Sequence, residues 1–348
     1  MPQTVTIQKN VQEYYGETLK SSADLKTSAC CPIDSMPAHL LPYLKKVHDE
    51  VKNRFYGCGS PIPQSIEGLT VLDLGCGTGR DAYVLSQLVG EKGKVIGVDM
   101  TEAQLAVAKK YIAHHTTEFG YAQPNVTFHH GYIENLQTVG IADASVDIVV
   151  SNCVINLSAD KEAVFREIFR VLKPGGELYF SDVFTGRRVP EALRHDPELL
   201  GECLGGALYI EDFRRMLRKI GCLDYRMMSK GSIALNEPSV EQKAGMIDFC
   251  SITVRAFKCD FEDICEDYGH VAIYKGTLSE APHAFRLDDH HLFRTGMPVL
   301  VCGNTAKMLS ETRFASHFTV HGDFSTHYGA FDCAPSTSDG TAVAGACC

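Results

Sequence analysis

The sequence predicts an α/β fold in which helices cover both faces of a parallel sheet. Three observations lead to this prediction. From Leu69 onward, short apolar runs alternate with amphipathic segments, as in strands joined by crossover helices. A glycine-rich loop with Gly75, Gly77 and Gly79 separates the first apolar run from the first amphipathic segment. The turn Pro174-Gly175-Gly176 precedes the last apolar run of the series.

Each expected strand is a short apolar run bounded by turn residues or by polar segments. In chain order the expected strands are residues 71–74, 94–98, 126–128, 146–150 and 177–180. The helices expected between them have apolar residues at helical spacing. They span residues 81–88, 102–114 and 159–172.

The flanking regions lack this alternation. Before it, two segments (7–19 and 39–54) are expected to be helical, and after it two more (191–202 and 211–219). Alternating apolar residues at 252–256 and 271–273 indicate an antiparallel β element. We therefore divide the chain into an N-terminal segment (1–66), a Rossmann-like domain (67–184), a helical region (185–250), a smaller α+β C-terminal domain (251–333) and a flexible tail (334–348).

Composition excludes several classes of function. The 348 residues include 33 basic and 43 acidic ones, a formal net charge of −10, and no basic tract. Such a chain is a poor match for nucleic acid or for an anionic membrane surface. No apolar run approaches the roughly 18 residues of a membrane span, and the N-terminus lacks a charged-then-apolar leader. We expect a cytoplasmic protein that acts as a monomer.

Fourteen cysteines are the unusual feature of the composition. In a reducing compartment, structural disulfides are improbable. No C-x-x-C pair occurs, and the only close pairs are Cys30-Cys31 and Cys347-Cys348, which are awkward as joint ligands of structural zinc. Another kind of thiolate chemistry is therefore expected.

The glycine loop indicates a nucleotide-like ligand. Asp73 precedes it, and Asp99 ends the next strand 20 residues after Gly79, where a carboxylate meets ribose hydroxyls in nucleotide-binding sheets. A dinucleotide fingerprint needs glycine at position 80, which is Arg80 here. The loop instead resembles the first motif of class I S-adenosylmethionine-dependent methyltransferases. The alternatives are a nicotinamide enzyme and a glycine-rich turn that binds no ligand.

Four segments of the chain each contain a cysteine in a distinctive context: SADLKTSAC (22–30), YGCG (56–59), SNCVINL (151–157) and GECLGGAL (201–208). Together these segments resemble the arsenite methyltransferase family, which methylates trivalent arsenic with S-adenosylmethionine. With the glycine loop, the resemblance extends over about residues 5–260. It implies four working cysteines, which these motifs place at Cys30, Cys58, Cys153 and Cys203.

The chemistry of arsenic agrees with these residues. As(III) is soft, and soft centres prefer thiolates; Cys58, Cys153 and Cys203 could hold it as a pyramid whose lone pair faces the methyl group. Cys153 follows the fourth strand, at the edge where open α/β sheets bind ligands. The family resemblance implies that thiols return arsenic to As(III) after transfer and leave a disulfide involving Cys30. Thioredoxin or glutathione would reopen it. Whether Cys30 or Cys31 pairs with Cys58 stays open.

The expected contacts of S-adenosylmethionine come from the loop, the strand ends and the neighbours of the cysteines. Asp99 is expected at the ribose and Met100 on the adenine, whereas Tyr56 and Asn152 adjoin cysteines that must approach the methyl group. The full set is Tyr56, Asp73, Gly75, Gly77, Gly79, Arg80, Asp99, Met100 and Asn152.

The sequence leaves two further functions open, a class I methyltransferase for an organic acceptor and a thiol protein that only binds metalloids. Cys347-Cys348 could bind arsenite and pass it inward, or could be an exposed pair without function. The run Asp288-Asp289-His290-His291 is expected to form a solvated loop. The other cysteines considered are expected to be small buried side chains. They are Cys76, Cys222, Cys250, Cys259, Cys265 and Cys302.

Overall fold

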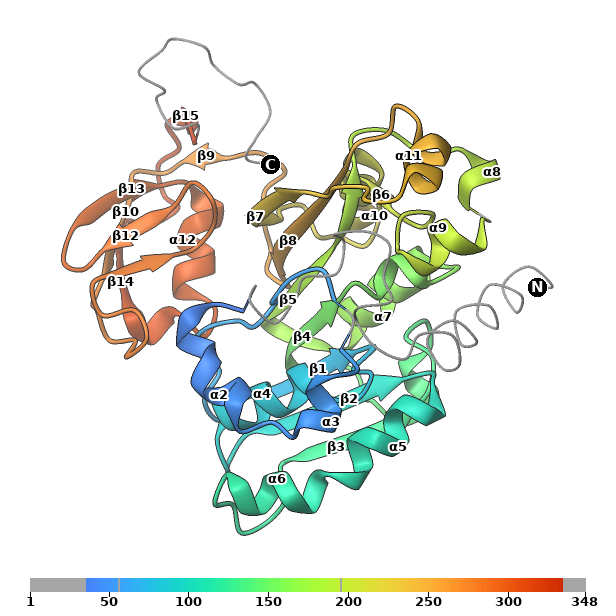
Figure 1. Cartoon of the computed structure of the whole chain (residues 1–348). Coiled ribbons are helices and arrows are strands. Elements are labelled where there is room, and N and C mark those ends of the chain that lie inside the picture. Colours follow the sequence, from blue (N-terminus) through green and yellow to red (C-terminus); the bar gives the residue numbers. More distant parts are fainter. Residues whose placement is uncertain (1–35, 56, 195, 334–348) are drawn as a thin grey trace.

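A computed structural model describes residues 36–333, except positions 56 and 195. Its central element is an eight-stranded sheet with the order β3-β2-β1-β4-β5-β8-β7, in which β6 also pairs with β5 (Figure 1). The strands are β1 (Thr70–Leu74), β2 (Lys94–Asp99), β3 (Val126–His130), β4 (Val146–Asn152), β5 (Leu172–Thr185), β6 (Leu208–Tyr209), β7 (Arg226–Ser232) and β8 (Phe249–Phe257). Strands β1 to β5 pair in parallel, which confirms the predicted α/β class.

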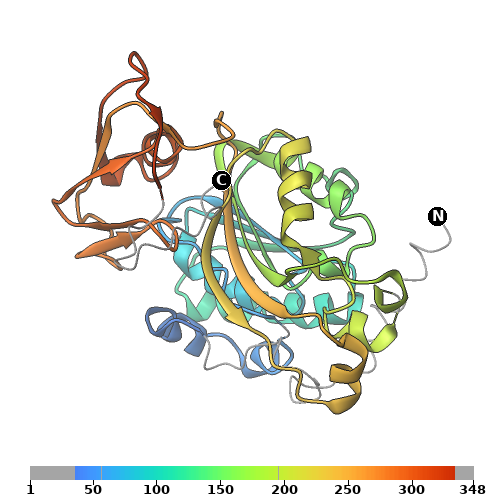
Figure 2. The same cartoon turned by 90° about the horizontal axis from the view of Figure 1, so that it is seen from above.

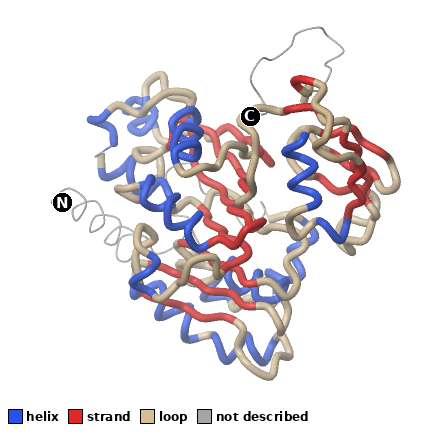
Figure 3. Tube along the Cα trace, turned by 180° about the vertical axis from the view of Figure 1, so that it is seen from behind, coloured by secondary structure: helices blue, strands red, loops and turns tan. Residues whose placement is uncertain are grey.

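Helices cover both faces of this sheet, as the tube view shows (Figure 3). Alternate residues of β1 belong to different cores, with Leu72 in the core that holds Phe165 and Phe213, and Val71 in the core that holds Tyr83. The helices and 3-10 turns of this part are α4 (Arg80–Val89), α5 (Glu102–Lys110), α6 (Ile112–Glu118), η5 (Leu136–Val139), η6 (Ile155–Leu157), α7 (Lys161–Val171), α8 (Glu191–Arg194), α9 (Pro197–Gly201), α10 (Ile210–Lys219) and α11 (Pro238–Ala244). Residues 81–88 and 161–171 are helical as predicted.

Three expected helices are each divided in the structure. The segment 39–54 forms η4 (Ala38–Leu40), α2 (Leu41–Lys45) and α3 (Asp49–Lys52), because the His48 ring accepts the Glu50 N–H and starts a new helix. The segment 102–114 breaks at Tyr111 between α5 and α6. The segment 191–202 breaks where Asp196 caps α9 and Pro197, which has no N–H to continue a helix, follows.

The C-terminal part builds a second, smaller β structure beside the central sheet (Figure 2). Its elements are β9 (Glu266–Asp267), β10 (His270–Tyr274), β11 (Ala284–Arg286), β12 (Leu292–Arg294), β13 (Pro298–Val301), α12 (Gly303–Ser310), η7 (Ala315–His317), β14 (Phe318–His321) and β15 (Gly329–Ala330). Strand β10 lies between β13 and β14, antiparallel to both. Its separate core includes Phe285, Phe293 and Phe314.

Strand β8 contains both the expected domain boundary at residue 250 and the expected β element at 252–256. It is antiparallel to β5 from Phe249 to Phe257, so the antiparallel element expected at 252–256 is confirmed as part of the central sheet. The boundary expected between residues 250 and 251 lies inside this strand, because the apolar alternation that marks β8 does not reveal which sheet it joins. The segments 1–35 and 334–348, with the helix expected at 7–19 and the expected tail, lie outside the described residues.

Buried ion pairs join the two parts. Arg226 on β7 binds Asp224 and, at 3.2 Å, Asp288 of the C-terminal part. Asp288 also accepts a hydrogen bond from the His291 ring and is only 1% exposed. The expectation of a solvated loop at 288–291 was therefore wrong at these two positions, because an arginine distant in sequence draws Asp288 inward. None of the described helices is long and apolar enough to cross a bilayer.

Candidate active site

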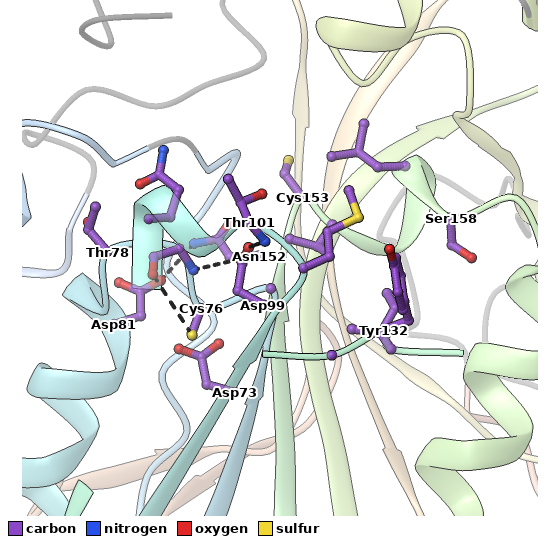
Figure 4. A pocket seen from close by; sticks show the side chains of 18 of the residues that line it. Asp73, Cys76, Thr78, Asp81, Asp99, Thr101, Tyr132, Asn152, Cys153 and Ser158 are labelled. Atoms are coloured by element: carbon purple, nitrogen blue, oxygen red, sulfur yellow. Dashed lines mark hydrogen bonds between the residues drawn. The ribbon is translucent and has the colours of Figure 1, made fainter. Parts of the chain in front are cut away.

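A cavity that is open to solvent lies at the carboxyl ends of β1, β2 and β4. This is the edge at which open α/β sheets bind ligands. The strand ends and the loops after them bring its lining together (Figure 4). Of the expected cofactor residues, the lining contains Asp73, Gly75, Gly77, Asp99, Met100 and Asn152.

The glycine loop has the backbone geometry that its sequence suggested. Gly75, Gly77 and Gly79 have φ values of +69°, +52° and +87°, which residues with a Cβ rarely adopt. A Cβ at Gly75 would also lie 2.3 Å from the side chain of Val154. The Gly77 N–H donates to Asp99 at 2.9 Å, so the acid that ends β2 fixes the loop after β1.

Four acidic side chains line the cavity, those of Asp73, Asp81, Asp99 and Glu134, against one basic side chain, that of Arg54. One buried oxygen of Asp73 has no hydrogen-bond partner among the described residues. Burial, with the charges of Asp81 and Asp99, raises the pKa of Asp73 well above its usual range. Burial also raises the pKa of Asp99, although hydrogen bonds from the N–H groups of Thr101 and Gly77 act to lower it. This lining favours a cationic ligand that can donate to Asp73.

The remaining expected cofactor residues have other positions. Arg80 is buried, pairs with Asp81 at 2.7 Å and lies over the ring of Phe55, and it is not part of the cavity lining. Gly79 is the residue before α4 and also lies outside the lining. Tyr56 lies outside the described residues.

Asn152 connects the cofactor side of the site to a cysteine. Its side-chain oxygen accepts the backbone N–H of Cys58 at 3.0 Å. Its amide nitrogen donates to the carbonyl of Gly59 and to Asp81, each at 2.9 Å. The loop that contains Cys58 is thereby held to the strand that precedes Cys153.

The structure brings together the three cysteines predicted as arsenic ligands. Cys58 and Cys153 form a disulfide with a Cα–Cα distance of 5.7 Å. The Cys203 thiol donates to the Cys153 carbonyl at 3.4 Å. All three are buried in one small apolar core with residues such as Val183 and Leu204.

The disulfide differs from the pairing considered from the sequence. Cys58 was expected to pair with Cys30 or Cys31, whereas here its partner is Cys153. Spacing along the chain could not reveal this pairing, because 95 residues separate the two cysteines. Cys30 and Cys31 lie outside the described residues.

Cys153 and Cys203 share an uncommon backbone conformation. Their φ values are +57° and +61°, and the only other described residues besides glycine with positive φ are Ser65 and Ala144. Strained conformations of this kind are found disproportionately at functional sites. The backbone therefore marks the same two cysteines that the motifs marked.

Two charged groups beside the cysteines were not predicted. An oxygen of Asp182, on β5, lies within 4.8 Å of the Cys58 and Cys153 sulfurs. Burial raises the pKa of Asp182 to about 7, although the N–H groups of Val183 and Asn156 and the charge of Lys161 oppose the shift. Burial lowers the pKa of Lys161 to about 8, and Asp182 and Cys203 act on it in the opposite direction.

The sequence contained signals for part of what was missed. Asp182 follows the apolar run 177–180, and Tyr132 and Glu134 follow β3, so the rule that ligands bind beyond strand ends would have selected all three. Asp81 stands two residues after the last glycine of the loop. Phe55 and Leu157 also line the cavity, and no pattern in the sequence distinguishes them.

Fold and site together define a class I S-adenosylmethionine-dependent methyltransferase: a parallel sheet, a glycine loop fixed by the acid of the next strand, and an acid-lined cavity. Residues 66–221 match the family model of a methyltransferase domain. Residues 268–343 match the model of the arsenite methyltransferase C-terminal domain.

Full-length relatives then identify the family. The chain is 54% identical to an arsenite methyltransferase of Aquipseudomonas alcaligenes, over 93% of both chains. It is 46% identical to the human arsenite methyltransferase, over 90% of this chain and 84% of that one. The chain belongs to the arsenite methyltransferase family, which confirms the resemblance seen in its sequence.

A solved structure agrees. An arsenic(III) S-adenosylmethionine methyltransferase from Chlamydomonas reinhardtii superimposes with a TM-score of 0.83 at 52% identity, over 85% of this chain and all of that one. The nicotinamide alternative is thereby excluded.

Proposed function

We propose that this enzyme methylates arsenite, and then methylarsenite, on Cys58, Cys153 and Cys203, in arsenic detoxification. One observation supports the proposal above all others: the three cysteines, from three distant segments, meet in one buried apolar core at the edge of the cofactor cavity. Three sulfurs match the three bonds of As(III), and the cysteines are buried among apolar side chains.

S-adenosylmethionine fits the polar groups of the cavity. Its sulfonium and ammonium charges match the excess of acidic over basic side chains in the cavity lining, and the unpartnered oxygen of Asp73 suits the ammonium group. We assign Asp99 to the ribose hydroxyls and Met100 to the adenine. Asn152 holds the Cys58 loop against this cavity, which would keep the methyl group and the arsenic in register.

The chemical step needs orientation rather than a base. The arsenic lone pair attacks the methyl carbon in line with the carbon–sulfur bond, and S-adenosylhomocysteine leaves with that electron pair. No proton is removed from the nucleophile, so the contribution of the protein is alignment, and effective molarities of about 10⁵ M or more are available from alignment. The positive charge of Lys161 beside Cys203 favours the thiolate needed to bind arsenic.

A thiol reductant completes the cycle. Methyl transfer formally converts As(III) to As(V), and two thiols that become one disulfide supply the two electrons that restore As(III). We assign one of these thiols to Cys30, or to its neighbour Cys31. The Cys58–Cys153 disulfide supports a need for thioredoxin or glutathione, because two of the three ligands must first be reduced. All assigned arsenic ligands belong to one chain, which suits a monomer in a reducing compartment such as the cytoplasm.

The test is S-adenosylhomocysteine release from the full chain, with and without arsenite and with and without a thiol reductant. We expect release only when both are present. Cys203→Ser should lower the rate at least 100-fold while calorimetry shows unchanged S-adenosylmethionine binding, and Cys259→Ser, half-buried and away from the site, serves as the matched control. Release without arsenite would point to an organic acceptor. Arsenite binding without release would point to a protein that only sequesters arsenic.

A further inference from the structure

Three other cysteines meet in the C-terminal part. The sulfur atoms of Cys265, Cys302 and Cys333 lie within 4.8 Å of one another, and none of the three takes part in a disulfide. They come from three separate segments, which lie closer together in sequence than the segments of the first site. The sequence pattern suggested only buried packing for Cys265 and Cys302, because no short spacing joins them.

Backbone pairing holds this three-cysteine cluster together. Strand β15 pairs with β9, and the Phe331 N–H donates to the carbonyl of Cys265 at 2.8 Å. These contacts hold the segment before Cys333 beside Cys265, so that the Cys333 sulfur lies close to the other two. Cys302 is fully buried and Cys265 nearly so, whereas Cys333 is half-buried. A small solute can therefore approach from the side of Cys333.

The surroundings of Cys302 favour a thiolate. Cys302 is the residue before α12, and its sulfur accepts the Thr305 N–H at 3.5 Å. A guanidinium nitrogen of Arg226 lies 3.9 Å from this sulfur. Arg226 is itself buried and paired to Asp224, so its charge is fixed beside the cluster.

The number of ligands indicates the kind of ion. Among the described residues, no histidine, aspartate or glutamate ligand atom lies within 4.8 Å of all three sulfurs. Structural zinc takes four ligands, whereas three sulfurs without a fourth suit a soft, three-coordinate centre. Three sulfurs bonded to one centre at about 2.3 Å, as in zinc–sulfur sites, lie no more than about 4.0 Å apart even in a flat trigonal arrangement. The three sulfurs, which lie within 4.8 Å of one another, would therefore close on such a centre by rotation of their side chains.

We propose that Cys265, Cys302 and Cys333 form a second binding site for trivalent arsenic, separate from the methyl-transfer centre. Three As–S bonds form as the three As–O bonds of arsenous acid break, and three waters leave. Each thiol supplies one proton to a departing hydroxyl, and where Cys302 is already ionised the solvent supplies that proton. Arsenic stays trivalent, so no oxidant or reductant is consumed. The site would hold arsenic that is not being methylated.

The test uses the full chain with Cys58→Ser, Cys153→Ser and Cys203→Ser, which removes the first site. After incubation with sodium arsenite and a phosphine reductant, bound arsenic is counted by mass spectrometry and its sulfur neighbours by X-ray absorption. We expect one arsenic with three sulfur neighbours per chain. Adding Cys333→Ser or Cys265→Ser should lower the arsenic bound through three sulfurs at least tenfold, and adding Cys259→Ser should not.

Arsenic that stays bound through three sulfurs in both the Cys333→Ser and Cys265→Ser variants would overturn the proposal, as it would belong to other cysteines. Binding of Zn²⁺ but not of arsenite would overturn the proposal as well. The fourth zinc ligand would then be His270, which interacts with Cys302. Its buried Nδ1 has no partner among the described residues. Bound arsenic is also counted in the chain that keeps Cys58, Cys153 and Cys203, as a control for misfolding of the triple variant. There Cys333→Ser should remove one arsenic. Because these readouts measure binding, they stand even if the proposed methylation fails.

Discussion

The side-chain oxygen of Asn152 accepts the backbone N–H of Cys58 across 94 residues of sequence, at 3.0 Å. Through its amide nitrogen the same side chain reaches Asp81 on the cofactor side. One residue therefore ties the loop that contains Cys58 to the lining of the cavity. In the proposed reaction, this contact would hold the arsenic in line with the methyl group.

Asn152→Leu should uncouple the two halves of the site. The change keeps the approximate volume but leaves the Cys58 N–H, the Gly59 carbonyl and Asp81 without this partner, at a cost of about 1–3 kcal/mol for each buried group left unsatisfied. We expect kcat/KM for arsenite to fall at least 100-fold, measured by S-adenosylhomocysteine release. A variant with wild-type kinetics would show that the loop is placed by other contacts.

Gly75→Ala should block the cofactor cavity. It adds a Cβ at 2.3 Å from Val154 and in a backbone of positive φ. Gly140→Ala is the matched control, because Gly140 also has positive φ but open space around it. We expect S-adenosylmethionine affinity to fall more than tenfold in Gly75→Ala only, by calorimetry, while Gly140→Ala loses about 1 kcal/mol of stability. Equal affinity in the two variants would contradict a role for close packing at Gly75.

The sequence predicted the parts of the site that follow from local pattern. The loop Gly75–Gly79, the acid Asp99 and the position of Cys153 after a strand could all be predicted, because strand period and glycine spacing determine them. The meeting of Cys58 with Cys153 depends on how a loop outside the sheet returns, which local pattern does not encode. The third cysteine of the C-terminal cluster, Cys333, was not considered at all, since only the pairing of β15 with β9 brings it close to Cys265.

The Cys58–Cys153 disulfide should control arsenic binding at the first site. Without reductant, two of the three sulfurs are bonded to each other and cannot bind arsenic. We expect the protein to expose two additional thiols on reduction, by thiol titration after unfolding, and to bind one additional arsenite. A Cys58→Ser variant should have one thiol fewer than the reduced wild type, and adding reductant should increase neither its thiol count nor its arsenite binding. Equal arsenite binding before and after reduction of the wild type would refute this control.

Asp182 should give the stability of the fold a distinct pH dependence. Burial raises its pKa to about 7, whereas an unfolded aspartate titrates near 3.9. Between these values the folded chain holds a proton that the unfolded chain has lost, so this group's contribution to stability falls as pH rises from about 4 to 7 and is constant above that. A difference of about 3 pKa units corresponds to at most about 4 kcal/mol. Asp182→Asn removes the titration, so its stability relative to wild type should increase by a few kcal/mol between pH 5 and pH 8 in urea unfolding of the reduced protein. A constant difference over that range would mean that Asp182 stays ionised in the fold, and that its backbone hydrogen bonds and Lys161 outweigh its burial.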